Sequence, residues 1–494
     1  MSNSYILAWD DIIYDLRDLL VDHEQVVYLV GGVVRDALLR QPTKDVDIAV
    51  ASGGIKLARK IANGLHGDFF PLDAERDVGR ALVDTPEGRL TIDVAGFRSE
   101  SLDADLRDRD FTINAMAVDL CGDLNAIIDP TGGMEDAFAK VIRRCNPDAI
   151  ARDPIRTLRA VRQSVQFGCR IEAETLKDIR QYAPRLLDTS VERVRDELFR
   201  LLALEKPGSA LRIADRVGLL TQVIPELAPL HDLRQHRDHQ HDAWNHTLAV
   251  VDSLSEILSV IDPHRTDNTT ASFNLGMIAV ALDGYRRQLQ AHFAQTWADE
   301  RSRRGLLMLA ALLHDIGKAM VMPAGDEDGE PRFGGHEEVG AGAAAERVAV
   351  LHLSNAEQDY VIKLVRYHMG SAIWLDDLAP LDIYHYWKRM GDAGVDLIFL
   401  TMADYWGAVG VRYEQDVWLR LIDHAQTLLR AYYKERERYI DLPVLVDGRG
   451  LMQELGLKPG PVVGELLEQI REAQVKGEVA SAEDALRFAR AYQH

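Results

Sequence analysis

The stretch Tyr28–Val50, YLVGGVVRDALLRQPTKDVDIAV, constrains the fold more than any other part of the chain. Its apolar start predicts a strand, and the apolar positions that follow Gly31 and Gly32 recur with helical spacing. Glycine lets backbone amides approach an anion closely, and a helix N-terminus adds a favourable dipole. The pattern therefore predicts a phosphate-binding turn between a strand and a helix, with Gly32 and Arg35 as candidate contacts.

Two aspartates, Asp45 and Asp47, open the next apolar run, which ends at Val50. The Val and Ile residues predict a strand, and residues two apart on a strand project to the same side. Neighbouring carboxylates repel one another unless a cation lies between them, and hard oxygen ligands suit Mg²⁺. Taken alone, the pair could also be a solvated strand end. Beside a phosphate-binding turn, it predicts one site for a metal-bound nucleoside triphosphate.

The composition is that of a soluble protein with several domains: 494 residues, 47% of them hydrophobic and 27% charged. No apolar run is long enough to cross a bilayer, and the first residues, MSNSYILAWDDII, lack the pattern of a signal peptide. We therefore expect a cytoplasmic protein with no membrane partner. The three cysteines, Cys121, Cys145 and Cys169, are too widely spaced to indicate a disulfide framework or a cysteine zinc site.

The net charge of −21 argues against a protein that coats long RNA without selectivity, because such binding needs a basic field. A nucleic-acid partner would have to be held by local patches. Arginines are concentrated between Arg143 and Arg216. Those outside a motif are expected to be ordinary residues on helix surfaces.

The character of the chain changes near Asp148. Residues 25–140 mix short Val- and Ile-rich strands with turns, which predicts a small domain built around a sheet. The rest is helical in pattern almost to the end, with Asp153-Pro154 as a helix start signal. Polar and turn residues predict a loop over Ile261–Asn274.

Two further stretches accompany the opening motif: DLRDRDFTINAMAVD (Asp105–Asp119) and RDPIRTLRAVRQSVQFGCRIE (Arg152–Glu172). Together the three resemble the class II tRNA nucleotidyltransferase and bacterial poly(A) polymerase family, a branch of the polymerase-beta-like nucleotidyltransferases. The resemblance covers about the first 230 residues. It implies an α+β fold, with a small N-terminal polymerase-beta-like sheet domain followed by a mostly α-helical body.

The resemblance also implies roles for residues of the first domain. Asp45 and Asp47 become the catalytic carboxylates that hold Mg²⁺, which fits the two-metal chemistry of nucleotidyl transfer. Gly32, Arg35 and Arg109 become contacts of the nucleotide. Asp93, in LTIDVAGFR, is either a third carboxylate or a strand-end aspartate.

Residues 153, 156, 159 and 162 are spaced three apart, which would align them along nearly one face of a helix. In the family the first acid–arginine pair, here Asp153 and Arg156, selects the incoming base, while the later arginines, here Arg159 and Arg162, hold phosphates. A carboxylate accepts from the exocyclic amine that C and A carry and U lacks. An arginine-rich amphipathic helix of no special role would show the same periodicity. The next helical motif, SVERVRDELFRLL (Ser190–Leu202), is expected to brace this helix.

The chain departs from the family at two positions. Family members usually carry Glu where this chain has Arg152, and Arg-Arg-Asp where it has Asp108-Arg109-Asp110. Both departures bear on base selection, so the sequence leaves open whether C, A or both are added.

A second set of motifs follows in order: WNHTLAV, LLHDIGK, GGHEEVGA, RYHMG and MADYWG. This set resembles the HD superfamily of metal-dependent phosphohydrolases. The implied ligands are His246, His314, Asp315, His336, His368 and Asp404. Imidazoles combined with carboxylates suit a transition metal such as Mn²⁺ or Ni²⁺ better than Mg²⁺, and His314-Asp315 could bridge two ions.

The two resemblances together predict four domains: a nucleotidyltransferase head (1–148), a nucleotide-selecting neck (149–230), an HD domain (231–440) and an RNA-binding tail (441–494). They imply an enzyme that adds C and A from CTP and ATP to the 3′ end of tRNA, with an HD phosphoesterase activity on RNA ends. Enzymes that add only CC or only A, and poly(A) polymerases, are the alternatives within the class. A phosphohydrolase whose N-terminal module only binds is the alternative from another class. The oligomeric state is left open.

Overall fold

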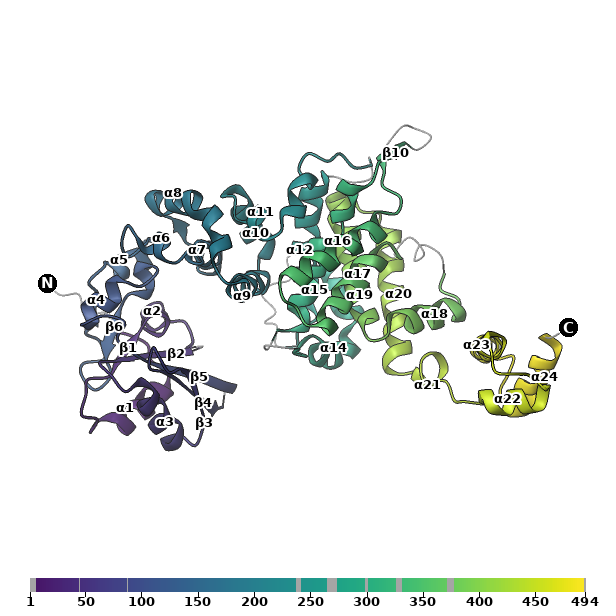
Figure 1. Ribbon diagram of the computed structural model, residues 1–494, viewed down its shortest axis with the longest axis horizontal. Helices are drawn as coiled ribbons and strands as arrows, with labels where there is room; N and C mark the ends of the chain where they lie inside the picture. Colours follow the sequence, from purple (N-terminus) through teal and green to yellow (C-terminus); the bar gives the residue numbers. More distant parts are fainter. Residues whose placement is uncertain are drawn as a thin grey trace. The chain divides into compact units, whose positions relative to one another are not determined.

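A seven-stranded sheet organises the N-terminal part of the chain (Figure 1). Its strand order is β3-β4-β5-β2-β1-β6-β7. The strands are β1 (Tyr28–Val30), β2 (Asp45–Val50), β3 (Asp68–Asp73), β4 (Val78–Thr85), β5 (Gly88–Gly96), β6 (Ala117–Asp119) and β7 (Ile127–Ile128). β2 and β5 run parallel, whereas the other neighbouring pairs are antiparallel. The sheet thus places β2 centrally, with β1 on one side and β5 on the other.

The structure is a computed structural model that describes residues 6–43, 45–86, 88–236, 241–263, 273–297, 301–325, 331–370 and 377–492. The chain divides into two compact units. The first comprises Met1–Leu204 and Ser209–Val223, and the second comprises Glu205–Gly208 and Ile224–His494. The division into four domains stays a prediction.

Amphipathic helices cover the sheet in the first unit. α3 (Gly54–Gly64) packs across β3, β4 and β5, and it buries Leu57, Ala58 and Ile61 there. α2 (Gly32–Leu38) packs against β1 and β2. The other helices of the sheet region are α1 (Asp11–Leu20), α4 (Leu102–Arg107), the short 3₁₀ helix η1 (Thr112–Asn114) and α5 (Gly133–Phe138).

A helical segment completes the first unit. It contains α6 (Ala149–Arg152), α7 (Arg156–Gln166), α8 (Ala173–Tyr182), α9 (Val191–Leu202), α10 (Pro207–Arg216) and α11 (Leu220–Val223). Two short parallel strands, β8 (Val141–Ile142) and β9 (Arg170–Ile171), connect it to the sheet region. α7 and α9 pack side by side, and this pair forms one wall of the site described below.

Where the structure describes the second unit, its regular elements are helices apart from the antiparallel strands β10 (Ala324–Gly325) and β11 (Pro331–Arg332). Its main helices are α12 (Ala243–Val260), α13 (Phe273–Ala281), α14 (Arg286–Phe293), α15 (Arg303–Leu313), α16 (His336–Val350), α17 (Asn355–Tyr367), α18 (Pro380–Met390), α19 (Ala393–Val409), α20 (Gln415–Tyr433) and α21 (Arg436–Tyr439). α12 packs along α19 and α15, and α16 packs along α17. Most of the loop predicted over Ile261–Asn274 lies outside the described residues, and α13 begins at Phe273.

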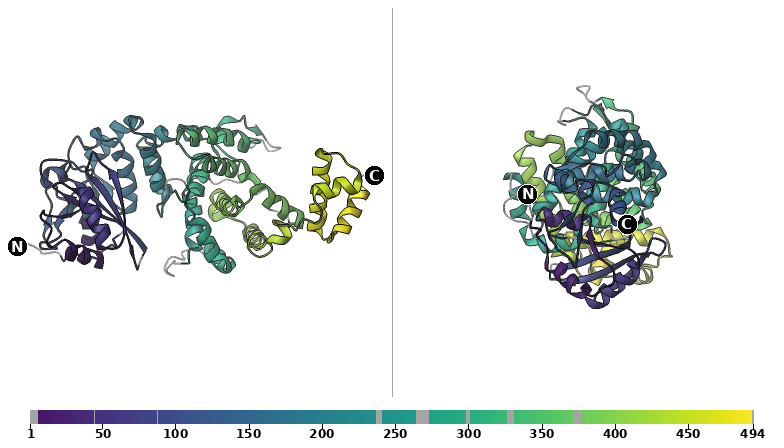
Figure 2. Two further views of the ribbon diagram at one scale, coloured as in Figure 1. Left: turned by 60° about the horizontal axis from the view of Figure 1, so that its bottom comes forward. Right: turned by 90° about the vertical axis from the view of Figure 1, so that its left-hand side faces the viewer.

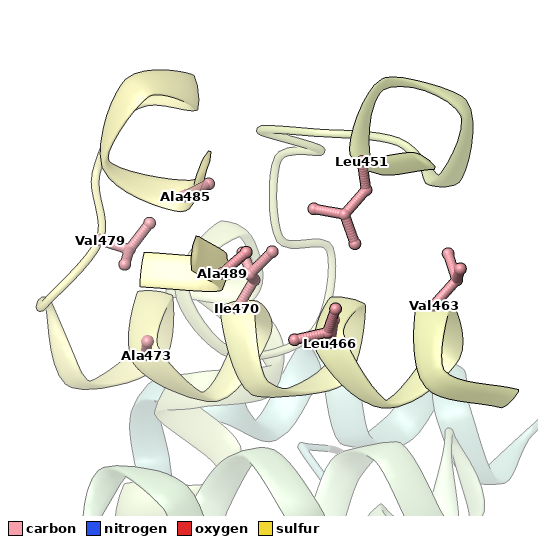
Figure 3. Close-up of a cluster of buried hydrophobic side chains, with 8 residues drawn as sticks. All are labelled: Leu451, Val463, Leu466, Ile470, Ala473, Val479, Ala485 and Ala489. Atoms are coloured by element: carbon pink, nitrogen blue, oxygen red, sulfur yellow. The ribbon is translucent and has the colours of Figure 1, made fainter. Parts of the chain in front are cut away.

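The C-terminal helices α22 (Gly448–Leu455), α23 (Pro461–Lys476) and α24 (Ala482–Tyr492) gather into a small bundle (Figure 2). Its core consists of Leu451, Val463, Leu466, Ile470, Ala473, Val479, Ala485 and Ala489 (Figure 3). Among the described residues, no helix of the chain is both long and apolar enough to cross a membrane.

The sheet in the first unit and the helices that follow it confirm the expected α+β fold, a sheet domain followed by a helical body.

Candidate active sites

β2 presents its two aspartates on one side, as the two-residue period of a strand requires. Asp45 is exposed and Asp47 is half-buried, whereas Val46 and Ile48 between and beyond them are buried. Asp47 also lies in register with Asp93 of the parallel strand β5. Asp93 makes a bidentate ion pair with Arg80, at 2.8 Å for both contacts. Asp93 is therefore already paired with an arginine of the neighbouring strand β4.

Burial raises the pKa of Asp47 to about 6. Arg109 opposes this shift, and the carboxylates of Asp93 and Asp45 reinforce it. Several acidic groups thus meet where the negative charge of Asp47 is costly. A divalent cation beside Asp45 and Asp47 would relieve that cost, so the donor set fits the expected metal.

Gly31 forms the turn between β1 and α2 with φ +77°, a conformation that favours glycine. A Cβ added at Gly31 would lie 3.0 Å from Arg109 Nη1 and 3.3 Å from Asp47 Oδ2. The turn therefore brings the backbone close to a guanidinium and to a candidate metal ligand at once. Arg109 itself donates to Asp105 Oδ2 at 3.3 Å.

Arg35, in the first turns of α2, is buried and bridges three elements. Its guanidinium donates to Asn114 Oδ1 at 2.6 Å, pairs with Asp36 at 2.8 Å and lies 4.0 Å from the centre of the Phe167 ring. Asn114 in turn donates to Asp110 and to Gln163 of α7. Arg35 therefore ties the glycine turn to the helical segment as well as reaching the pocket.

A pocket of about 500 Å³ joins these groups. Its lining residues are Gly31, Gly32, Arg35, Asp36, Asp45, Asp47, Arg76, Arg98, Arg109, Asp110, Asn114, Asp153, Arg156, Arg159, Arg162, Gln163, Gln166, Phe167, Arg193 and Arg200. All nine predicted residues of the nucleotide site, catalytic aspartates included, are among them. Nine arginines against five aspartates give the pocket the charge that a triphosphate needs.

The expected helix start at Asp153 is wrong. α7 begins at Arg156, and Asp153 follows α6 in an extended conformation with φ −142° and ψ 92°. The reason is local, because Pro154 disfavours the helical conformation for the residue before it. The Asp153 carboxylate accepts a hydrogen bond from Arg193 of α9 at 2.8 Å and lies 3.9 Å from Arg156 Nε.

The three arginines of α7 share a face, as their spacing predicts, but their partners differ. Arg156 is buried and donates to the backbone carbonyls of Asp108, Arg109 and Ala149 at 3.0–3.2 Å. Arg159 pairs with Asp110 at 3.1 Å. The hydrogen bonds of Arg156 and the ion pair of Arg159 therefore join α7 directly to the segment that carries Arg109.

Glu197 of α9 holds the same arginine face from the other side. It is 3% exposed and accepts from Arg162 at 2.9 Å, from Arg200 at 3.1 Å and from Arg159 at 3.4 Å. These contacts agree with the bracing role expected of this helix. Because each arginine has five N–H groups, those of Arg159 and Arg162 that remain can still meet a phosphate.

Arg152, the first departure from the family pattern, pairs with Asp108, which is part of the second. Arg152 Nη1 lies 2.7 Å from Asp108 Oδ1, and Arg152 Nη2 lies 3.5 Å from Asp148 Oδ2. Arg193, and not Arg152, is the close partner of the Asp153 carboxylate. The chain thus places an arginine and an aspartate together at the two positions where it departs from the family.

The six histidine and aspartate residues of the second motif set also converge. They come from α12 (His246), the end of α15 (His314 and Asp315), the start of α16 (His336), the end of α17 (His368) and α19 (Asp404). Their ligand atoms form two groups, His246, His314 and Asp404, and Asp315, His336 and His368. Within each group these atoms lie within 4.8 Å of one another.

Backbone carbonyls orient three of the imidazoles. His314, His336 and His368 each place Nδ1 2.6–2.7 Å from the carbonyl oxygen three residues earlier. Since a carbonyl only accepts, Nδ1 must carry the proton, which leaves Nε2 of a neutral ring as a lone-pair donor toward the centre. This is the arrangement that a bound metal requires of its histidine ligands.

Asp315 lies between the two groups. Its Oδ2 is 3.2 Å from His314 Nε2 and 3.4 Å from His246 Nε2, and its Oδ1 is 3.2 Å from His336 Nε2. A carboxylate that offers one oxygen to each group can bridge two ions. Lys318 also donates to Asp315 Oδ2, at 2.7 Å, which partly balances its charge.

The centre is buried and rich in carboxylate charge. Burial lowers the pKa of His314, but Asp315 and Asp404 outweigh it and raise that pKa to about 10. The five other ligand residues are buried, and Asp404 has an 18% exposed side chain. Converging nitrogen and oxygen donors in such a place fit a divalent cation.

A third group, His385, Glu468 and Glu472, was not expected from the sequence, and Lys388 already pairs with its Glu468.

Four family profiles match the chain in order. They are described as "Poly A polymerase head domain" (residues 27–143), "Probable RNA and SrmB- binding site of polymerase A" (168–230), "HD domain" (289–405) and "tRNA nucleotidyltransferase domain 2 putative" (437–489). An A-adding tRNA nucleotidyltransferase of Deinococcus radiodurans is 30% identical over 93% of this chain and 94% of the relative. The chain belongs to the CCA-adding enzyme and poly(A) polymerase family. It is a nucleotidyltransferase with an HD domain.

Other members of the family agree in sequence and in fold. A multifunctional CCA protein of Halorhodospira halophila is 32% identical over 69% of this chain and 73% of the relative. A CCA-adding enzyme solved in complex with ATP shares 19% identity with a TM-score of 0.61, and the match covers 98% of this chain and 95% of that one. At that identity the structural likeness shows that the family fold is shared.

Several residues of the nucleotidyltransferase pocket escaped the sequence analysis. Asn114 and Gln163 connect Arg35 to α7, and Phe167 lies against the Arg35 guanidinium. Asn114 and Phe167 stand inside quoted motifs, but nothing in their spacing indicates which side chains they meet. Arg76 stands in no quoted stretch, whereas Arg98 ends LTIDVAGFR without having been given a role; both reach the pocket from loops beside the strands.

Proposed function

We propose that the first unit adds C and A from CTP and ATP to the 3′ end of tRNA without a nucleic-acid template. The observation that supports this most is the single pocket that contains Asp45 and Asp47 at one wall and Asp153 and Arg156 at another. Catalytic carboxylates and base-selecting groups would then face one nucleotide. Profile matches to a polymerase head and an RNA-binding site, together with the CCA-adding relatives, support the same substrates.

In the proposed reaction the triphosphate lies against the glycine turn, where amides at the start of α2 and the Arg109 guanidinium favour its charge. Asp45 and Asp47 would hold Mg²⁺, which when bound lowers the pKa of the RNA 3′-hydroxyl and steadies the leaving pyrophosphate. Asp153, held by Arg193, would accept from the exocyclic amine of C or A. The remaining N–H groups of Arg159 and Arg162 would contact phosphates.

A second candidate is an enzyme that adds only CC or only A. Relatives named as A-adding and as CC-adding enzymes each match 93% of the chain, whereas the multifunctional relative matches 69%. The Arg152–Asp108 pair beside the base-selecting residues also bears on this choice.

One experiment separates these candidates. Three RNAs are incubated with CTP, with ATP and with both: a tRNA that ends before the CCA sequence, a tRNA that ends after CC, and an unrelated RNA. The CCA-adding proposal requires CMP addition to the first tRNA, AMP addition to the second and complete CCA with both nucleotides. CMP addition alone, or AMP addition to the second tRNA alone, would establish a split enzyme. Long A tails on the unrelated RNA would establish a poly(A) polymerase.

We propose that the HD centre hydrolyses phosphate esters at RNA ends, including 2′,3′-cyclic phosphates. The six converging ligands support this function, and a bound transition metal such as Mn²⁺ or Ni²⁺ would supply a Lewis acid and an activated water there. The test is opening of a 2′,3′-cyclic phosphate at the end of a short RNA to a phosphate monoester, with Mn²⁺, Ni²⁺ or Mg²⁺ added to metal-free protein. If the HD centre is active and no RNA accepts a nucleotide, the chain is a phosphohydrolase whose N-terminal unit only binds.

We also propose that residues 168–230 and the tail helices contact the tRNA. The RNA-binding profile covers the first of these segments, and a tRNA nucleotidyltransferase profile covers residues 437–489. Protection of a bound tRNA from nucleases by the full chain, compared with a chain that ends before residue 441, would test the contribution of the tail.

A further inference from the structure

Three arginines of the segment 152–159 hold three consecutive residues, 108–110, from one side. Arg152 pairs with the Asp108 side chain at 2.7 Å, and Arg159 pairs with the Asp110 side chain at 3.1 Å. Between them Arg156 donates to the carbonyl oxygens of Asp108 and Arg109 at 3.0 and 3.1 Å. Backbone and flanking side chains of segment 108–110 are thus fixed to the base-selecting part of the chain.

The Arg109 side chain is the exception, because its guanidinium lies beside Asp105 and near the glycine turn at Gly31. It lines the nucleotide pocket beside Gly31 and Asp47, where the triphosphate is expected. Its neighbours in sequence, Asp108 and Asp110, pair with Arg152 and Arg159, and Asp110 also lines the pocket. Asp105 holds the Arg109 guanidinium directly at 3.3 Å, and the anchoring of residues 108 and 110 fixes the backbone from which the side chain extends.

The Arg152–Asp108 ion pair connects the two proposed substrate contacts, because each of its residues is next in sequence to one of them. Arg152 precedes Asp153, the proposed base contact, and Asp108 precedes Arg109, the proposed triphosphate contact. Arg156 and Arg159 are buried or half-buried and also serve other partners. The Arg152–Asp108 pair, with side chains 59% and 37% exposed, is the part of this connection that can change without disturbing the core.

We propose that Arg152 and Asp108 act as positioning residues, and that their ion pair fixes the Arg109 guanidinium relative to the Asp153 carboxylate so that one nucleotide meets both. This inference rests on the proposed function. It adds that productive CTP or ATP binding depends on a pair that touches neither base nor phosphate. An exposed ion pair contributes little to folding, so its effect should appear in substrate binding rather than in stability.

A simpler explanation would be that the two charges act only through the electrostatic field of the pocket. The two explanations disagree about Asp108→Arg. That substitution adds positive charge beside the triphosphate site, so a field effect would tighten the binding of CTP and ATP. Loss of the positioning pair would weaken it. Arg152→Glu is expected to weaken CTP and ATP binding under both explanations, and it is the second single variant of the experiment.

The experiment measures equilibrium binding of CTP, ATP and inorganic tripolyphosphate to the full chain without RNA, and steady-state addition to tRNA. Asp108→Arg and Arg152→Glu are each expected to weaken CTP and ATP binding threefold to tenfold and to raise KM more than they lower kcat. Tripolyphosphate binding should change less than twofold, because it does not reach Asp153. The melting temperature should stay within about 1 °C of that of the unaltered protein.

The double variant Asp108→Arg/Arg152→Glu restores the pair with its charges exchanged and keeps the net charge. It is expected to recover CTP and ATP affinity to within about twofold, since Asp148, the other neighbour of Arg152, is 70% exposed and its repulsion is screened by solvent. The matched control is the Arg107–Asp103 pair on α4, which has a similar exposure and a separation of 2.8 Å. Exchanging its charges should leave binding unchanged.

Tighter CTP and ATP binding by Asp108→Arg would overturn the proposal in favour of a field effect. A double variant no better than the weaker single variant would overturn it too, as would an equal effect from the control pair. If the binding pattern holds while no RNA accepts a nucleotide, the positioning role stands and the proposed function fails. If the unaltered protein binds neither CTP nor ATP, both fail.

Discussion

At the scale of single residues, Asp47 is the clearest case of a side chain kept for a ligand rather than for the fold. Burial and the nearby carboxylates of Asp93 and Asp45 favour its protonated form, although Arg109 opposes them. A carboxylate in that position does not stabilise the metal-free fold through its charge. A cation bound beside Asp47 would relieve the cost of its charge.

Asp47→Asn is accordingly expected to reduce nucleotide addition about a thousandfold, which corresponds to ~4 kcal/mol of lost transition-state stabilisation. The free energy of unfolding should stay the same or rise slightly. Single-turnover addition of CMP and AMP to tRNA measures the first, and urea unfolding measures the second. Asp84→Asn, at an exposed side chain of β4, is the control and should keep full activity. Addition by Asp47→Asn within tenfold of normal would remove Asp47 from the catalytic site.

Gly31 and Gly53 can be compared to test the glycine turn. Both precede a helix and have nearly equal positive φ angles, +77° and +78°. An added Cβ would meet Arg109 and Asp47 at Gly31 but nothing within 4 Å at Gly53. Alanine should cost about 1 kcal/mol of backbone strain at Gly53, whose ψ of 28° is left-handed helical, and more at Gly31, whose ψ is −129°. Only Gly31→Ala should also lower nucleotide addition, by at least tenfold in kcat/KM. Equal activities of the two variants would show that the close approach at Gly31 is unimportant.

Asp153→Ala tests the base contact. Removing the carboxylate that would accept the exocyclic amine is expected to cost ~1–3 kcal/mol of discrimination, roughly tenfold to a hundredfold, and to let UTP compete. Steady-state incorporation of each of the four nucleotides gives the ratio. Arg193→Ala, which keeps the carboxylate but removes its 2.8 Å partner, should relax selectivity less. Unchanged selectivity in Asp153→Ala would leave α7 and its neighbours as a phosphate-binding face.

At the scale of elements, the packing of α7 on α9 depends on Glu197. Three arginines surround this buried carboxylate, so α9 supplies the negative charge that lets α7 present an arginine face. Without it, the guanidinium groups would repel one another across a small area. The helix pair is therefore both a wall of the pocket and an electrostatic unit.

Glu197→Gln should lower the free energy of unfolding by about 2 kcal/mol, because it removes charge from a buried ion-pair network. Burial raises the pKa of Glu197, but Arg162 and Arg159 outweigh it, so the folded-state pKa is below its usual value. The stabilisation is present above the unfolded pKa of about 4.3 and is lost as pH falls through the folded-state pKa. Urea unfolding at several pH values measures this loss. Glu174→Gln, an exposed carboxylate on α8, should show neither effect.

At the scale of the whole molecule, the two candidate metal sites belong to different compact units. The carboxylates of β2 are in the first unit, and the candidate ligands of the HD centre are in the second. Each is assembled from elements of its own unit. We therefore expect the two chemical activities to be separable by substitution.

His314→Ala should abolish metal-dependent phosphoesterase activity and leave nucleotide addition within about twofold of normal. Asp404→Asn, at the partly exposed candidate ligand, should do the same. This second variant keeps the test valid if the buried histidine variant misfolds. Both variants and Asp47→Asn are assayed for both activities. Simultaneous loss of the two activities in a variant that stays folded would indicate that the HD centre supports tRNA binding or the fold, not a separate reaction.

Much of this protein could be predicted from the sequence because the signals are local. The β1 strand, the Gly31 turn, the α2 helix and the aspartate-bearing β2 strand follow from the residues of one short stretch. The α+β fold followed from the order of several motifs. The histidines of the HD centre could be named because each lies in a motif whose position in the chain order is informative. Their roles as ligands stay predictions.

Only the tertiary structure decided which side chains meet. Spacing placed Asp153 on a helix, but Pro154 keeps it extended, and its partner Arg193 lies on α9. Arg152, the neighbour of Asp153 in the sequence, pairs with Asp108, 44 residues away. Arg35 proved to connect to Asn114, 79 residues away. Periodicity defines which side of an element a residue occupies, whereas ion pairs and hydrogen bonds between distant segments depend on how those segments pack, and no local pattern contains that information.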